Sequence, residues 1–595
     1  MNKDCEDKYL AFEDLNKTTM DFAAIETEKF RNAFRADSKR IRKEIREFSD
    51  VVNIMQVKIN GKHKALLYRE RDSYCISVDG NEVVRSDNII TWFSTDESFS
   101  MLSYFETEGS DLGDLYILDS GKIIQKLHGF FGGVKFFGNR YYILKSFRGE
   151  DQAEGVEKNA ERVILDGKIV WGDGISNTEF IDIDVYGKKC LVSVGNWMKT
   201  TIYSGLIEDP STWEKLYSFD SPAQPLGIVG NDVYILKFSK NGMVLKNGSV
   251  IIESEHPVEN VIIVSDGLLT FILKDARLST VLYDFNGKIV KEMQLEEASG
   301  LITSSSDLKK ASFYSSSLGI PYSEYIFENG SITKVSELKL IDAEIKDEFA
   351  DSSGTRVHYF LASGKNSGHR RALVYGYGGF NVSTTPNYRF PFAYLLSKGV
   401  DVVLCNLRGG SEYGENWHLD GIRDKKINVF NDFFSVIKDL KNRGYDIVIE
   451  GASNGGLLTS YTLINHPESI KGAVIGKPVI DMLRFHLLYT GIYWVNEYGD
   501  PANEVDREFL ASYSPYSNIE SRKYPASLIW TRMNDDRVHP AHALKFYAKL
   551  KETGSETYLR ADFSGGHIGL THERQIEESS EILSFELRCL GEVQK

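Results

Sequence analysis

One serine in this sequence has the neighbours of a catalytic nucleophile. Ser453 lies at the centre of GASNG, residues 451 to 455, between the strand-like letters YDIVIE and the helix-like letters LLTSY. In a G-x-S-x-G turn of this kind, small neighbours permit a sharp bend that lifts the serine oxygen above the sheet, and the helix N-terminus supplies a favourable dipole. An ordinary glycine-rich turn is the alternative interpretation, so a catalytic role requires partners elsewhere in the chain.

Two later segments offer those partners. A serine hydroxyl becomes nucleophilic when a base, usually a histidine held by a carboxylate, removes its proton. The strand SLIWTRM runs into the acidic pair Asp535 and Asp536, and the strand TYLRADF leads to His567 in a glycine-rich loop. Loops at the carboxyl ends of parallel strands meet on one side of a sheet. A solvated acidic pair and a surface histidine are the alternatives, but the order serine, aspartate, histidine favours an α/β-hydrolase triad.

The elements that would position these residues alternate between strands and helices from about residue 350. We expect buried strands in RALVYGYGG, VDVVLCNLRGG, YDIVIEGASNGG, GAVIGKP, ASLIWTRMNDD and TYLRADF. Helical spacing relates Val429, Phe433, Val436, Ile437 and Leu440, and the run AHALKFYAKLKETG closes with a glycine, as helices often do. This alternation predicts a doubly wound α/β domain with a mostly parallel sheet.

An all-β region precedes it, from about residue 50 to 335. Its apolar runs are divided by turn dipeptides typical of β-hairpins, namely Asp79-Gly80, Ser120-Gly121, Asp166-Gly167, Asn247-Gly248, Asn286-Gly287 and Asn329-Gly330. The glycines are 41, 46, 81, 39 and 43 residues apart, and the longest gap holds IYSGLIEDPSTWEKLYSF, in which a proline-containing turn replaces the dipeptide. Seven units with this period predict a seven-bladed β-propeller. A large β-sandwich is the alternative.

The first 48 residues differ again. Their apolar residues follow roughly helical spacing among many charges, with Asp21 as the expected N-cap: Phe22, Ile25, Phe30, Phe34 and Ile41. We therefore expect a helical segment before the propeller.

Composition sets limits on compartment and partners. A chain of 595 residues is too long to fold around a single hydrophobic core, so we expect at least two domains. Its net charge of -15 repels nucleic-acid phosphates and anionic lipids. We find neither an apolar leader nor a run of 18 apolar residues, so we expect neither secretion nor a membrane partner. The five scattered cysteines, Cys5, Cys75, Cys190, Cys405 and Cys589, suggest no disulfide framework or zinc site. These features indicate a cytoplasmic protein, and we expect a monomer.

Six motifs together make the chain resemble the prolyl oligopeptidase family along essentially its whole length. They are YGYGGFN (375–381), NLRGGSEYGENWH (406–418), GASNGGLL (451–458), WVNEYG (494–499), NDDRV (534–538) and GGH (565–567). The resemblance implies a helical segment over residues 1–48 that packs on the hydrolase domain, a seven-bladed propeller over 49–337 and an α/β-hydrolase domain over 338–595. It also implies a reaction that requires neither metal nor cofactor.

The resemblance assigns roles to individual residues. Ser453 resembles the nucleophile, His567 the general base, and Asp535 the residue that orients the imidazole, with Asp536 as the alternative. The oxyanion would be held by the Tyr377 hydroxyl and the Asn454 backbone N–H. Arg537 matches a residue that binds a substrate carbonyl. The residues that match the pocket for a proline ring are Phe380, Ile480, Trp494, Tyr498 and Val538.

The implied activity is that of a serine endopeptidase which cleaves short peptides on the carboxyl side of proline through an acyl-enzyme, with the propeller limiting access. An aromatic and aliphatic pocket favours proline over arginine at the cleaved position. Two alternatives remain: an esterase or broader-specificity oligopeptidase on the same triad, and a propeller binding module with an inert hydrolase domain. The presence of all three triad residues argues against the inert module.

Overall fold

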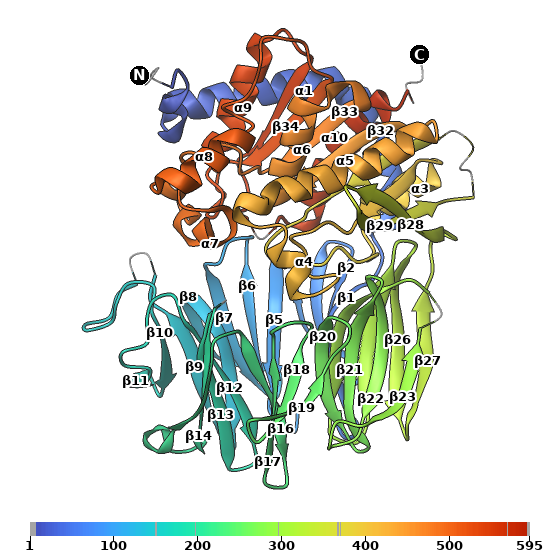
Figure 1. Ribbon diagram of the computed structural model, residues 1–595. Helices are drawn as coiled ribbons and strands as arrows, with labels where there is room; N and C mark the ends of the chain where they lie inside the picture. Colours follow the sequence, from blue (N-terminus) through green and yellow to red (C-terminus); the bar gives the residue numbers. More distant parts are fainter. Residues whose placement is uncertain are drawn as a thin grey trace. The chain divides into compact units, whose positions relative to one another are not determined.

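A computed structural model describes residues 7–148, 151–196, 198–295, 297–365, 368, 370–567 and 569–591. Its contacts divide the chain into two compact units, shown as ribbons in Figure 1. The propeller unit comprises Val52–Ser316 and Tyr322–Leu338. The hydrolase unit comprises Met1–Val51, Ser317–Pro321 and Lys339–Lys595. Each unit is described by itself below.

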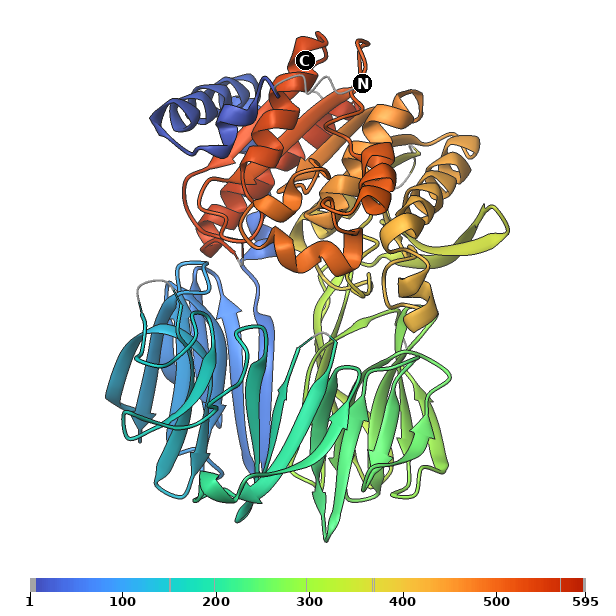
Figure 2. The ribbon, with the colours of Figure 1, turned by 60° about the vertical axis from the view of Figure 1, so that its left-hand side comes forward.

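Most strands of the propeller unit pair with their neighbours in sequence (Figure 2). Their bounds are β1 Asn53–Asn60, β2 His63–Glu70, β3 Ser73–Val78, β4 Asn81–Ser86, β5 Ile89–Thr95, β6 Met101–Thr107, β7 Gly113–Asp119, β8 Lys122–Phe137, β9 Arg140–Ser146, β10 Glu161–Leu165, β11 Lys168–Trp171, β12 Phe180–Tyr186, β13 Lys189–Gly195, β14 Thr200–Leu206, β15 Glu214–Phe219, β16 Ala223–Val229, β17 Asp232–Lys237, β18 Met243–Lys246, β19 Ser249–Glu253, β20 Val258–Val264, β21 Gly267–Lys274, β22 Arg277–Tyr283, β23 Ile289–Gln294, β24 Gly300–Ser306, β25 Ala311–Ser317, β26 Ile320–Glu328 and β27 Ser331–Leu338.

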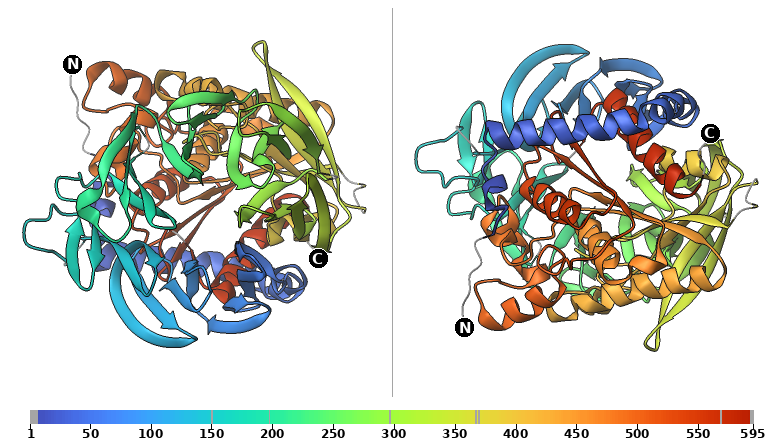
Figure 3. Two further views of the ribbon diagram at one scale, coloured as in Figure 1. Left: turned by 90° about the horizontal axis from the view of Figure 1, so that it is seen from below. Right: turned by 90° about the horizontal axis from the view of Figure 1, so that it is seen from above.

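These strands form a propeller domain. Five sheets have four strands each, in the orders β1-β2-β3-β4, β12-β13-β14-β15, β16-β17-β18-β19, β20-β21-β22-β23 and β24-β25-β26-β27. A sixth sheet runs from β5 to β11, and its long strand β8 pairs with β7 through its first half and with β9 through its second half. The left view of Figure 3 shows the sheets arranged around a centre.

The predicted turn dipeptides are confirmed as hairpin turns. Asp79 and Gly80 join β3 to β4 with φ of 52° and 78°, the left-handed conformations that a two-residue hairpin of this kind requires. The other five dipeptides also lie between paired strands. The proline-containing turn Pro210–Thr212 joins β14 to β15, as predicted. Local turn chemistry therefore sets where the hairpins of the propeller reverse.

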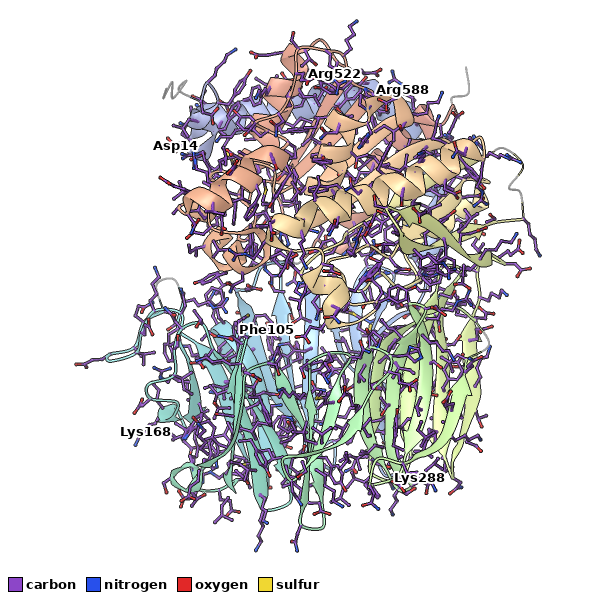
Figure 4. The ribbon with its side chains drawn as sticks, viewed as in Figure 1. Asp14, Phe105, Lys168, Lys288, Arg522 and Arg588 are labelled. Carbon is purple, nitrogen blue, oxygen red and sulfur yellow. The ribbon has the colours of Figure 1, made fainter. Side chains whose placement is uncertain are left out.

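Apolar faces of consecutive sheets pack against each other. One cluster contains Leu144 on β9, Val163 on β10 and Val192 on β13, all fully buried. Phe105, labelled in Figure 4, is buried in a cluster formed within the sheet from β5 to β11, whereas Lys168 and Lys288 lie at exposed positions of the same unit. Each sheet thus buries its faces between two neighbours, which is how propellers form a core.

The hydrolase unit contains one eight-stranded sheet in the order β28-β29-β31-β30-β32-β33-β34-β35. The bounds of its strands are β28 Glu344–Ser352, β29 Thr355–Ser363, β30 Arg371–Tyr375, β31 Asp401–Cys405, β32 Asp446–Ala452, β33 Gly472–Gly476, β34 Ala526–Arg532 and β35 Thr557–Asp562. The last six were predicted, and their parallel pairing is confirmed. The antiparallel hairpin of β28 and β29, which extends the sheet, was not predicted.

Helices cover this sheet. Their bounds are α1 Lys17–Glu44, α2 Arg46–Ser49, α3 Phe390–Ser397, α4 Glu415–Leu419, α5 Lys426–Asn442, α6 Asn454–Asn465, α7 Val495–Tyr498, α8 Glu504–Tyr513, α9 Ala541–Glu552 and α10 His572–Cys589. The right view of Figure 3 shows strands lying between α1 and α10 on one side and α5 and α6 on the other. The predicted helices α5 and α9 are confirmed, and the five apolar residues named for α5 are buried.

The helix at the start of the described chain begins earlier than predicted. The expected N-cap at Asp21 is wrong, because the Asn16 side chain accepts the Thr19 N–H at 3.1 Å and caps α1 there. α1 packs along α10 and β35, and Arg31 forms a 2.8 Å ion pair with Glu581 of α10. Phe30 is fully buried, but Ile25 is exposed.

No helix among the described residues has the length and hydropathy needed to cross a bilayer. Cys75, Cys190, Cys405 and Cys589 carry free thiols, and Cys5 lies outside the described residues.

Candidate active site

Ser453 occupies a strained turn between β32 and α6. Its φ of 58° and ψ of -117° are unusual for a residue with a side chain, and its N–H donates to the Gly476 carbonyl at 2.8 Å. A Cβ on Gly451 would lie 2.4 Å from the Gly455 carbonyl oxygen, so the turn requires glycine there. This backbone presents a partly exposed serine at the carboxyl end of the sheet.

His567 and Asp535 form a close pair on the loops after β35 and β34. The imidazole Nδ1 lies 2.8 Å from one Asp535 carboxylate oxygen and 3.0 Å from the other. Burial alone would raise the pKa of Asp535, but its bond to His567 and the N–H groups of Arg537 and Val538 hold that pKa below its usual value. Asp536 instead accepts the His567 backbone N–H at 3.4 Å. Asp535 is therefore the carboxylate that contacts the ring.

Ser453 and His567 flank the end of β33. Gly476 accepts the Ser453 N–H, and the next residue, Lys477, donates from its ammonium group to the His567 carbonyl at 3.3 Å. Within the part of the chain that the structure describes, no hydrogen bond joins the Ser453 hydroxyl to the imidazole. Catalytic hydrogen bonds are often long in the absence of substrate and tighten on binding. The direct link between these two side chains stays a prediction.

Two groups near Ser453 have the chemistry of an oxyanion hole. Burial raises the pKa of the Tyr377 hydroxyl, although its interaction with the Ser453 side chain lowers that pKa in part, so the hydroxyl stays a donor at neutral pH. Asn454 is the first residue of α6, and a helix leaves its first N–H groups without partners inside the helix. The Asn454 amide donates to the Tyr377 carbonyl at 2.6 Å and accepts the Tyr498 hydroxyl at 3.1 Å. These bonds hold both donors beside the serine.

The residues predicted to hold a proline ring belong to one hydrophobic cluster. Phe380 meets Tyr498 edge to face, with ring centroids 5.4 Å apart. Phe380 and Trp494 are partly exposed, whereas Ile480, Tyr498 and Val538 are buried. The two rings of Phe380 and Trp494 are therefore partly accessible, whereas the other three residues belong to the buried part of the cluster.

Arg537 is exposed and lies on the loop after β34 that also carries Asp535. Its N–H donates to Asp535 at 2.9 Å, and its carbonyl accepts the Thr490 hydroxyl at 3.2 Å. The backbone of Arg537 is thus fixed directly beside the carboxylate that holds His567.

A buried charge network that the sequence analysis missed supports the loop with Tyr377 and Phe380. Glu497 accepts the Phe380 N–H at 3.0 Å and pairs with Lys426 at 3.1 Å and with His418 at 2.9 Å. The Lys426 ammonium also donates to the Gly378 carbonyl at 3.1 Å. Glu497 lies in the motif WVNEYG and His418 in NLRGGSEYGENWH. A charged or polar residue beside aromatic residues in each motif was the available sign of a buried network.

Replacing Glu497 with glutamine is expected to lower the free energy of unfolding of the hydrolase unit by about 3 to 5 kcal/mol, because Lys426 would keep a buried charge without its partner. Urea denaturation at pH 7 measures this loss. The matched control is Glu504→Gln, which changes an exposed glutamate of α8 and should shift stability by less than about 0.5 kcal/mol.

The contribution of Glu497 to the free energy of unfolding is expected to depend on pH. Burial alone would raise the pKa of Glu497, but attraction to Lys426 and the bond to His418 lower it below its usual 4.5. A carboxyl whose pKa is lower in the folded state stabilises the fold fully above its unfolded pKa, and this contribution disappears as the pH falls through the folded pKa. The stability difference between wild type and Glu497→Gln should therefore shrink below about pH 4.5. A difference that stays constant down to pH 3 would contradict this ionic role.

The described residues include no group of three or more His, Cys, Asp or Glu side chains arranged to hold a metal ion.

Comparisons with known proteins find a family profile, curated relatives and solved structures to which this chain is similar. The profile described as the prolyl oligopeptidase family matches residues 386–593. A prolyl endopeptidase from Elizabethkingia meningoseptica is 31% identical over 366 residues, which cover 58% of this chain and 52% of the relative, so the match spans about half of that protein. A chain from a structural study of two prolyl endopeptidases superposes with a TM-score of 0.87 at 22% identity, covering 98% of this chain and 97% of that chain. Prolyl oligopeptidase B from Galerina marginata, bound to a 25-residue macrocyclization substrate, gives a TM-score of 0.86 at 18% identity, with coverage of 98% and 95%.

Proposed function

We propose that this chain, whose residues 386–593 match the profile described as the prolyl oligopeptidase family, is a serine peptidase that cleaves short peptides on the carboxyl side of proline. The observation that carries the proposal is the Asp535–His567 pair beside the turn that presents Ser453. These side chains come from three loops at the carboxyl ends of parallel strands in one sheet.

The proposed reaction begins at the prolyl carbonyl. Ser453 Oγ attacks its carbon while His567 Nε2 takes the hydroxyl proton, and Asp535 stabilises the imidazolium through Nδ1. The negative charge that forms on the carbonyl oxygen is stabilised by the Tyr377 hydroxyl and the Asn454 N–H. Breaking the C–N bond returns the proton from His567 to the leaving amine and leaves an acyl-enzyme on Ser453. Water, deprotonated by His567, then attacks the ester carbon; the C–Oγ bond breaks, Ser453 Oγ takes the proton back from His567, and the peptide acid leaves.

Specificity for proline is supported by the rings at the site. Trp494 and Phe380 offer flat, partly exposed surfaces over a buried apolar base, and a rigid pyrrolidine ring can stack on such a surface. The five residues assigned to the pocket are aromatic or aliphatic, and the nearby carboxylate of Glu497 is already paired with Lys426 and His418. We propose that Arg537 binds a substrate carbonyl through its guanidinium group.

A peptide series that varies only at the residue before the cleaved bond tests the proposal. We expect proline to exceed alanine and arginine by at least tenfold in kcat/KM, a difference of about 1.4 kcal/mol. Trp494→Ala should reduce this preference, whereas Tyr493→Ala, which alters the exposed neighbouring ring, should leave it unchanged. Alanine or arginine outperforming proline tenfold would contradict the pocket assignment, and aryl esters outperforming every peptide would indicate an esterase.

Finer features of the architecture also belong to this proposal. We propose seven blades, because the sheet from β5 to β11 divides at β8 into two sets of four strands, β5 to β8 and β8 to β11. The domain boundaries near residues 48 and 337 are part of the same proposal. They are supported by the change from helical spacing to short strand-like runs near the first, and to alternating strands and helices near the second.

We further propose that the propeller restricts substrates to short peptides and that the protein is a cytoplasmic monomer. The size restriction is supported by the resemblance to the family, and the cytoplasmic location by the free thiols of the four described cysteines. Comparing a short proline peptide with the same sequence in a folded protein tests the restriction: the folded substrate should remain uncut.

A further inference from the structure

Two consecutive carbonyls of the histidine loop are each held by a cation. Arg532, at the end of β34, donates from Nη1 to the Gly566 carbonyl at 2.9 Å, and Lys477 donates from Nζ to the His567 carbonyl at 3.3 Å. The proposed mechanism uses neither cation. The loop itself is rich in glycine, and Gly565 has a φ of 69°, so its backbone has many alternative conformations that must be restricted from outside.

Arg532 is anchored by a buried ion-pair network. Its Nη2 lies 2.9 Å from Glu578 on α10, and Arg560 pairs with Glu578 at 2.9 Å and with Glu581 at 2.7 Å. Arg31 of α1 also contacts Glu581. The carbonyl of Gly566 is therefore tied, through Arg532, to two helices that cover the sheet.

Lys477 has a different and more local anchor. Its φ of 37° is unusual for a residue with a side chain, and its N–H donates to the Trp530 carbonyl at 2.7 Å. Its ammonium lies 5.5 Å from the Trp530 ring centroid. The preceding residue, Gly476, accepts the Ser453 N–H. The last residue of β33 and the residue after it thus contact the nucleophile turn and the histidine loop, respectively.

We propose that Lys477 is a positioning residue that sets the placement of His567 relative to Ser453, with Arg532 as a second fixed point on the same loop. This inference rests on the proposed role of His567 as general base. Asp535 fixes one nitrogen of the ring, and the Lys477 ammonium fixes the backbone that carries it. Because the His567 ring and its backbone are both held, the second ring nitrogen, Nε2, points in a fixed direction. Misplacing a catalytic group by about 1 Å can cost about 100-fold in rate.

The charge of Lys477 gives the proposal a distinctive readout. The charged groups that face it are Arg532 at the end of β34, Asp535 and Arg537 on the following loop, and Glu578 on α10. Burial, together with repulsion by Arg532 and Arg537, lowers the pKa of Lys477 to about 8 against the attraction of the two carboxylates. Below that pH the bond to the His567 carbonyl is charge-assisted and strong, and above it the bond weakens as the proton leaves. Arginine at this position would keep its charge.

The experiment compares Lys477→Met, Lys477→Arg and the control Lys471→Met, using the full chain. Lys471 lies before β33, at the strand's other end, and pairs on the surface with Asp446. The readouts are the rate at which a fluorophosphonate labels Ser453 and the pH profile of kcat/KM for a proline peptide. We expect Lys477→Met to lower both by about 100-fold at pH 7, with KM changed little, and Lys471→Met to match the wild type.

The arginine variant separates positioning from general support of the fold. Lys477→Arg should recover most of the activity lost in Lys477→Met and should keep it to higher pH than the wild type, whose activity should fall near pH 8. Labelling of Lys477→Met within threefold of the wild type would overturn the proposal, as would an unchanged alkaline decline in Lys477→Arg. If Lys477→Met fails to fold, the arginine profile alone decides. Absence of labelling in the wild type would instead contradict the proposed function.

Discussion

Replacing Ser453 with alanine is expected to lower kcat/KM for a proline peptide by about 10⁵ to 10⁶-fold, the loss that removal of a triad nucleophile produces. The reason is that His567 and Asp535 activate no other atom: without the serine oxygen, only direct attack by water remains. The hydroxyl lies in a turn whose backbone is fixed by the bond from its own N–H to Gly476, so removing Oγ should leave the turn intact. Single-turnover assays at high enzyme concentration measure the residual rate.

The loss of kcat/KM in Ser453→Ala measures the chemical step only if this variant still binds the peptide. Ser453→Ala should bind the same peptide with nearly unchanged affinity, because the oxygen that is lost acts mainly in the transition state. Ser512→Ala, which removes an exposed hydroxyl bonded to the Phe509 carbonyl of α8, should keep full activity. Residual activity above about 1% in Ser453→Ala would show that another residue is the nucleophile, since that loss is far smaller than removal of a triad member causes.

Replacing Tyr377 with phenylalanine is expected to lower kcat by about 10² to 10³-fold while KM changes little. The hydroxyl would stabilise negative charge that exists only after attack, so its loss weakens the transition state more than the bound substrate. The raised pKa of this hydroxyl keeps it protonated and able to donate at the working pH. Steady-state kinetics that separate kcat from KM test the prediction.

A second tyrosine provides the control. Tyr461 lies on α6, and its ring stacks on Phe430 with centroids 4.0 Å apart. Tyr461→Phe removes a phenolic hydroxyl from the same unit and should leave kcat within about twofold, since surface and packing changes of this size usually have small effects. Equal losses in both variants would indicate a general structural cost rather than oxyanion stabilisation.

Features set by neighbours in the chain were predictable from the sequence. The hairpin turns follow from dipeptides such as Asp79-Gly80, whose second residue tolerates positive φ. The turn at Ser453 follows from the glycines that flank it, since a Cβ at Gly451 would meet the backbone. The meeting of Asp535 with His567 was predictable because each directly follows a strand of one parallel sheet. The link from His567 to Ser453 was predicted on the same basis and awaits its test.

Other features were set by contacts that the local sequence does not reveal. The hairpin of β28 and β29 was missed because β28, EIKDEFADS, is mostly exposed and lacks a buried apolar run; the Ser353-Gly354 turn was the signal for it. The start of α1 was misplaced because Asp21 and Asn16 are both suitable N-caps, and only the contact with Thr19 distinguishes them.

The buried charges were the least predictable part of the site. Lys426 lies in a helix whose apolar spacing is clear, but its partner Glu497 is 71 residues away. Lys477 likewise meets a carbonyl 90 residues further on. Pairing over such distances depends on the order of strands in the sheet, and a single sequence contains no pattern that specifies it. These charges hold the loops of Tyr377 and His567, so they complete the site that the motifs only outline.

The proposed peptidase activity depends above all on the activation of Ser453 by His567. Its most direct test is to label the protein with a fluorophosphonate, locate the adduct by peptide mass mapping, and repeat the labelling with folded His567→Ala. We expect the wild type to carry one adduct, on Ser453. The labelling rate of His567→Ala should be lower than that of the wild type by about 1,000-fold or more. Labelling at another serine, or equal labelling of Ser453 without His567, would contradict it.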